Sequence, residues 1–120
     1  MIKAYKLYTG ADGHSYVEKG TIAEKVFTQV TSLHFKETPP HATYDWHPAP
    51  DTQYVLTLTG TLEFTTSLGE TFTLQPGEVL LATDLTGAGH KWKMLGDQPW
   101  KRAYVVFSPE TVINFLPDVD

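Results

Sequence analysis

The sequence predicts an all-β domain, built either as a barrel or as a two-sheet sandwich. Short segments rich in Val, Thr, Phe and Tyr recur along the chain, and clusters of Gly, Pro and Asp separate them at close intervals. That spacing is typical of antiparallel barrels and sandwiches. No segment carries helical periodicity over the length of an ordinary helix. The chain has 120 residues, so we expect one domain over residues 1–120.

The first third of the chain contains four strand-like segments. Residues 2–8 alternate apolar and polar side chains and predict an edge strand, while residues 14–20 predict a second short strand or an ordered loop. The segments 26–36 and 43–46 are also strand-like. Pro39 and Pro40 separate these two segments, because proline donates no hydrogen bond to a sheet.

The rest of the chain alternates strands with glycine turns. The predicted strands cover residues 53–59, 62–66, 71–74, 79–82, 90–95 and 101–107. Turns are expected at Gly60, Gly69, Gly77 and Gly96, where glycine can take a positive φ. After the last strand, Ser108 and Pro109 resemble a helix start, so a short C-terminal helical segment is predicted over residues 109–116.

Composition and charge exclude several classes of function. The formal net charge is −5 with scattered acidic groups, which argues against nucleic-acid binding because that needs a basic face. The absence of cysteine excludes disulfides, thiolate metal sites and cysteine nucleophiles. No apolar run is long enough to span a membrane, and residues 1–5 lack the apolar core of a signal peptide. The expected location is therefore cytoplasmic, with no membrane partner.

A histidine-containing stretch before the strand at 53–59 resembles the first motif of the cupins, G-x5-H-x-H-x3/4-E-x6-G. His47 stands at the first histidine position, Gln53 at the glutamate position and Gly60 at the closing glycine. Ala49 replaces the second histidine, and His41 replaces the opening glycine.

The second cupin motif, G-x5-P-x-G-x2-H-x3-N, has a partial counterpart further along. Gly77 matches, two extra residues follow, and Gly87 and His90 then match, whereas Met94 stands at the asparagine position. The resemblance covers about residues 25–107. It implies a cupin-type double-stranded β-helix, or jelly-roll barrel.

In the cupin family, the motif residues usually bind a divalent metal inside the barrel. Carried over to this chain, the resemblance implies a ligand set of His47, Gln53 and His90. Two imidazoles and an amide oxygen could hold Mn²⁺, Fe²⁺, Ni²⁺ or Zn²⁺. The charge of such an ion has no matching carboxylate in the motif, unless Asp45 or Asp84 turns inward.

Strand alternation extends the predicted site beyond the motif residues. If His47 points inward, Asp45 does too and becomes a candidate acid or base. Trp92 shares the face of His90, and Trp92 and Tyr104 are candidates to line a ligand pocket. Asp84 is expected chiefly to cap its own turn, with a site role as the alternative.

Other aromatic and apolar residues are expected in the core or in an interface. Trp46, Trp100 and Tyr54 are assigned mainly to these places. An outward apolar stripe is predicted near Leu56, Leu58 and Leu80, and by analogy with small cupins it suggests a homodimer.

Two functions remain open from the sequence. The first is a small-molecule enzyme in which His47, Gln53 and His90, with or without metal, support isomerase, lyase or decarboxylase chemistry. The second is a non-catalytic module that binds a small ligand, or acts as a sensor, through a decayed metal site. Ala49 and Gln53 favour the second function, and the retained histidines favour the first.

Overall fold

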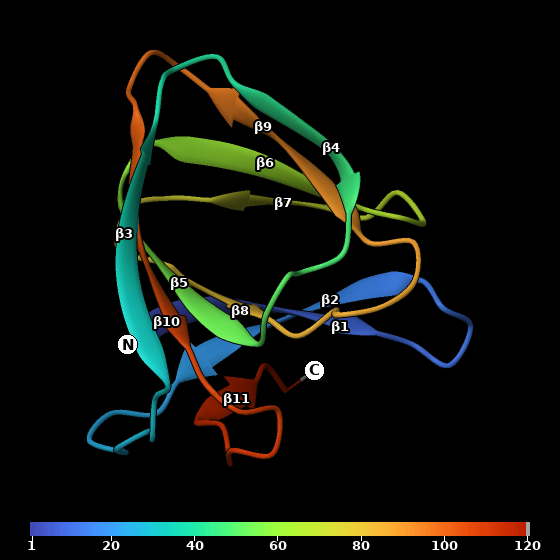
Figure 1. The fold of residues 1–120 in the computed structure, drawn as a ribbon, viewed down its shortest axis with the longest axis vertical. Coiled ribbons are helices and arrows are strands. Elements are labelled where there is room, and N and C mark those ends of the chain that lie inside the picture. The colour runs from blue at the N-terminus through green and yellow to red at the C-terminus, as the bar shows by residue number, and fades with distance from the viewer. Residues whose placement is uncertain (120) are drawn as a thin grey trace.

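A computed structural model describes residues 1–119 as two β-sheets, with no helix among these residues (Figure 1). The strands are β1 Ile2–Thr9, β2 Ser15–Ile22, β3 Ser32–Thr38, β4 Thr43–His47, β5 Gln53–Thr59, β6 Thr61–Thr66, β7 Thr71–Leu74, β8 Val79–Ala82, β9 His90–Leu95, β10 Trp100–Val106 and β11 Phe115–Pro117. The all-β prediction is confirmed, and most strand bounds agree with the predicted ones to within two residues.

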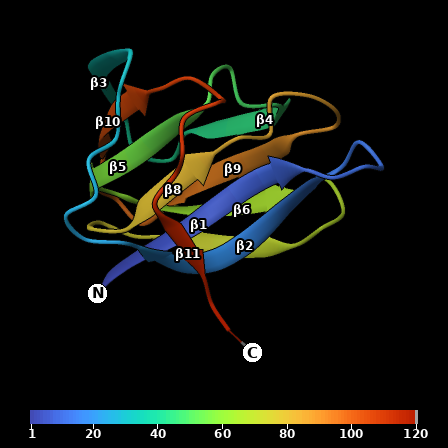
Figure 2. The ribbon, with the colours of Figure 1, turned by 90° about the horizontal axis from the view of Figure 1, so that it is seen from below.

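The two sheets differ in size and lie face to face. The larger sheet has the order β11-β2-β1-β8-β5-β10-β3, and the smaller one has the order β4-β9-β6-β7 (Figures 1 and 2). Strands β1 and β8 pair in parallel, and every other pairing in the described chain is antiparallel. The arrangement is consistent with a β-sandwich.

The alternating sequence of the central strands explains the core between the sheets. Along β6, Leu62, Phe64 and Thr66 are buried while their neighbours are half-buried. The register places Phe64 opposite Trp92 and Thr66 opposite His90 on β9. Each strand therefore sends every second side chain to the space between the sheets, as a period of two requires.

Two predictions at the ends of the chain are wrong. Residues 2–8 do not form an edge strand, because β1 pairs with both β2 and β8. The segment 109–116 is not helical: a turn leads into β11, which pairs with β2. The buried ring of Phe115 packs in a second apolar cluster with Ala4 and Leu81, on the outer side of the large sheet. Sheet pairing and the burial of Phe115 outweigh the helical preference of this segment, which is too short to form a stable helix alone.

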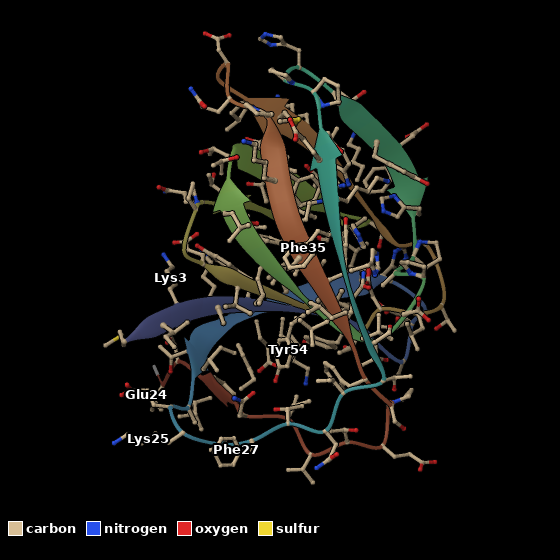
Figure 3. The ribbon with its side chains drawn as sticks, turned by 60° about the vertical axis from the view of Figure 1, so that its left-hand side comes forward. Lys3, Glu24, Lys25, Phe27, Phe35 and Tyr54 are labelled. Carbon is tan, nitrogen blue, oxygen red and sulfur yellow. The ribbon has the colours of Figure 1, made fainter. Side chains whose placement is uncertain are left out.

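The outer face of the β5–β10–β3 region is apolar and exposed. Phe35 on β3 is 70% exposed and Phe27, in the loop before β3, is 98% exposed (Figure 3). Leu58 belongs to this surface, but Leu80 was misassigned to it: Leu80 is buried between the sheets. Trp46 is also not a core residue, since it is 46% exposed and lies under the ammonium group of Lys91.

No helix capable of crossing a membrane occurs within the described residues 1–119.

Candidate functional site

A cavity of about 510 Å³ opens between the two sheets at the end formed by β3, β4 and β10. Its size suits a small molecule. Every site residue predicted from the sequence lines this cavity except Asp45: they are His47, Gln53, His90, Trp92 and Tyr104. Ala49, at the position of the second cupin histidine, lines it too. The structure therefore brings both histidines and the glutamine to one cavity.

The best-defined contact in the cavity wall joins His90 to Asp84. His90 Nδ1 lies 2.6 Å from Asp84 Oδ2, and the two side chains are 5% and 0% exposed. Since a carboxylate only accepts, the hydrogen of this bond is on Nδ1. The Ser15 hydroxyl donates to the same Asp84 oxygen at 2.7 Å. Asp84 thus fixes both the tautomer and the orientation of His90.

Asp84 does not cap its own turn, contrary to the main expectation for it. Its side chain bonds Ser15 on β2 and His90 on β9, while its backbone carbonyl accepts from the N–H of Ala49. Asp84 Oδ1 is the one sealed side-chain polar atom without a partner among the described residues. This buried carboxylate therefore keeps unused accepting capacity.

His47 lies beside His90, with ring centroids 4.6 Å apart. Its Nδ1 is 2.7 Å from the carbonyl oxygen of Asp45, so this nitrogen also carries the proton. Tyr44 packs on the other side of His47, with ring centroids 4.1 Å apart. Burial lowers the pKa of His47 below its ordinary value of 6.5, and the neighbouring His90 contributes in the same direction. Burial therefore favours the neutral form of His47.

A β-bulge explains why Asp45 does not face the cavity. Tyr44 is opposite Trp92 and His47 is opposite His90, so three residue steps on β4 correspond to two on β9. The extra residue places Tyr44 and His47 on the same face and turns Asp45 outward. Asp45 is exposed, and its carboxylate accepts from the N–H of Trp46. The structure thus does not bring Asp45, the candidate acid or base, to the cavity, because simple alternation does not hold across a bulge.

Glycine at position 89 allows the two histidine strands to approach. Gly89 has a φ of 76°, and a Cβ placed there would lie 2.3 Å from the carbonyl oxygen of His47. Only glycine accepts both the left-handed backbone and this contact. Gly89 thus lies directly against the His47 backbone, and this close approach sets the spacing of the imidazoles.

The residues fit only part of a metal centre. Both histidines have Nδ1 bonded to oxygen and Nε2 free, which is how metal-binding histidines are usually held. Gln53 on β5 is 5% exposed and could add a neutral amide oxygen. Within residues 1–119, however, no group of three His, Cys, Asp or Glu side chains converges on one point.

The sequence reasoning missed the basic character of the opposite wall. Lys36 and Arg102 face the cavity from β3 and β10, and His34 adds a third nitrogen-bearing side chain. One carboxylate, that of Asp51, lines the same cavity, and that of Asp84 lies behind His90. The pairing of β3 with β10 places these residues side by side, and local sequence patterns gave no signal for that pairing.

No protein-family model matches the chain, and the search of curated proteins found no match.

Proposed function

We propose that the chain is a small cupin-type domain whose cavity binds a small organic molecule and moves a proton on it. The observation that carries this proposal is the Asp84–His90 contact, in which a sealed carboxylate holds an imidazole on a cavity wall. Carboxylate-oriented imidazoles serve as general bases in many unrelated enzymes. The cupin assignment is supported by the positions of His47, Gln53 and His90, which the fold brings together.

In this proposal His90 is the catalytic base and Asp84 is a positioning residue. His90 Nε2 takes a proton from a carbon or hydroxyl next to a carbonyl, forming imidazolium, and the Asp84 carboxylate stabilises that positive charge. In an isomerase, His90 returns the same proton to a neighbouring atom of the intermediate. A lyase instead expels a leaving group from the intermediate. In a decarboxylase, loss of CO₂ from a carboxylate forms the carbanion, to which His90 in its imidazolium form gives a proton.

The direct test is proton exchange in D₂O. A panel of small ketones, aldehydes and 2-oxo acids is incubated with the protein, and loss of the C–H signal is followed by proton NMR. We expect exchange above the buffer rate for at least one compound. His90→Gln should abolish it, and Asp84→Asn should slow it by about 100-fold or more and alter its pH profile. His41→Asn is the matched control, because His41 is exposed and its φ of 70° suits asparagine.

Binding without exchange for every compound would overturn the enzymatic proposal. It would instead favour the second candidate, a non-catalytic ligand-binding or sensor domain. The replacement of a family histidine by Ala49 supports that candidate.

A metal-dependent form of the site is a further candidate, supported by the paired free Nε2 atoms of His47 and His90. Those two nitrogens and the Gln53 amide would hold the ion, and a divalent metal such as Mn, Fe, Ni or Zn would supply Lewis acidity. Elemental mass spectrometry of untagged protein tests this. About one metal per chain, lost in His90→Ala, supports it; absence after reconstitution with each of the four metals rules it out.

We also propose a homodimer through the exposed apolar surface around Phe35. Strand β3 is the edge of the large sheet, so its outer hydrogen-bonding groups are unpaired within the described chain. A second copy presents the same edge and the same apolar surface, which a two-fold interface can match. Phe35→Glu should convert dimer to monomer in sedimentation velocity, whereas Lys19→Glu, at an exposed position on β2 far from β3 in the strand order, should not. A wild-type monomer at all concentrations would contradict the proposal.

A further inference from the structure

The cavity contains a buried positive charge that the proton-transfer site does not use. Arg102 on β10 is 2% exposed and lines the cavity. Within residues 1–119, no carboxylate lies within ion-pair distance of its guanidinium. A buried charge without a counter-charge is unfavourable, and proteins normally pair it.

The hydrogen bonds of Arg102 leave one end of the guanidinium free. Nε donates to the Tyr104 hydroxyl at 2.9 Å, and Nη1 donates to Thr38 Oγ1 at 2.7 Å and to the Trp100 carbonyl at 3.1 Å. Nη2 has no hydrogen-bond acceptor among the described residues, yet it is not one of the solvent-inaccessible atoms that lack a partner. Its two N–H donors therefore open on the cavity.

The guanidinium is also held rigidly before any ligand arrives. Its carbon lies 3.7 Å from the centroid of the Trp100 ring, so the side chain stacks on the indole. Trp100 is fixed in turn by its N–H bond to Thr57. A stacked, hydrogen-bonded arginine loses little freedom when it binds a carboxylate.

One further positive charge lies on this wall. Lys36 on β3 is exposed, is directly opposite Arg102 in the strand register and lines the same cavity. His34, two positions further along β3, stacks on Tyr104. Among residues 1–119, Asp51 is the one acidic side chain that lines the cavity, and it is also exposed.

We infer that the ligand is a small organic acid and that Arg102 binds its carboxylate. The acid's carbonyl or hydroxyl end then extends toward His90 on the facing sheet. The assignment rests on the proposed function for the identity of the reacting end, while the carboxylate site rests on Arg102 alone. A carboxylate supplies a counter-charge to the guanidinium and accepts hydrogen bonds from the two N–H groups of Nη2.

The test compares acids with their uncharged amides. Isothermal titration is run with acetate, pyruvate and benzoate, each beside its primary amide, and with inorganic phosphate. We expect at least one acid to bind about tenfold or more tightly than its amide. Arg102→Gln should remove that preference and Arg102→Lys should weaken it, whereas Lys101→Gln, on the exposed face of the same strand, should retain it.

Equal binding of acids and amides, no binding of any acid, or tighter binding of phosphate than of every acid would each overturn the inference. The acid–amide comparison needs no variant, so a misfolded Arg102→Gln does not spoil the test. His90→Gln separates the two proposals. If His90→Gln binds acids normally and the wild type shows no exchange, the proton-transfer proposal fails and the carboxylate site stands. If the wild type exchanges protons equally fast on acids and on their amides, the carboxylate site fails and the proton-transfer proposal stands.

Discussion

The two ends of the space between the sheets are built differently. At the closed end, Leu7, Leu62 and Leu74 are fully buried, and the rings of Phe64 and Phe72 stack 5.1 Å apart. At the open end, β3 and β4 are largely exposed and leave a cavity lined by both polar and apolar side chains. The closed end is an ordinary packed core that supports a site at the open end.

The regular strands build the packed core, whereas the irregular strands border the cavity. Clean alternation holds along β6, whereas β4 carries a bulge and β10 has a register shift next to Arg102. Bulges redirect side chains at sheet rims. The irregular strands β4 and β10 are thus the ones that direct His47 and Arg102 into the cavity.

The largest effect on stability should come from the closed end. Leu62→Ala leaves a cavity in a core with no room to relax, so it should lower the free energy of unfolding by about 2–5 kcal/mol. Leu58→Ala makes the same change at a side chain that is 58% exposed and should cost about 0.5 kcal/mol or less. Urea denaturation measures both. Similar losses for the two variants would mean that the closed end is not the stabilising region.

Gly89→Ala should lower the free energy of unfolding by less than Leu62→Ala does, but it should also change the site. Its Cβ would collide with the His47 carbonyl, and alanine disfavours the positive φ, so we expect about 1–3 kcal/mol of destabilisation. The separation of the imidazoles should change, shifting the ring-proton resonances of His47 and His90. Gly69→Ala has a comparable φ of 94° but open space around it, so it isolates the backbone cost. Unchanged histidine resonances in Gly89→Ala would refute the spacing role.

The smallest effect concerns pH. The pKa of His47 is lowered in the folded state, so the unfolded chain binds its proton more tightly. The stability contributed by neutral His47 is complete above its unfolded pKa of about 6.5 and is lost as the pH falls below that value. The melting temperature of the wild type should therefore fall more steeply below pH 6.5 than that of His47→Gln. Parallel pH curves for the two proteins would contradict a desolvated His47.

The sequence by itself determined the all-β class, most strand positions and four of the residues that define the cavity, His47, Gln53, His90 and Trp92. The all-β class and the strand positions depend on local alternation and turn residues, which a linear pattern records. His47, Gln53 and His90 follow from the resemblance to the cupin motifs. Tyr104, an aromatic candidate for the pocket, also lines the cavity.

Only the tertiary structure decided the rest. The bulge that excludes Asp45, the pairing of β11 in place of a helix, and the contact of Asp84 with His90 all depend on partners distant in sequence or on a changed register. Arg102 is the clearest case, because the lack of a carboxylate within ion-pair distance of it among residues 1–119 is a property of the assembled sheets. Charge balance inside a cavity depends on which strands become neighbours, and those neighbours are fixed only when the chain folds.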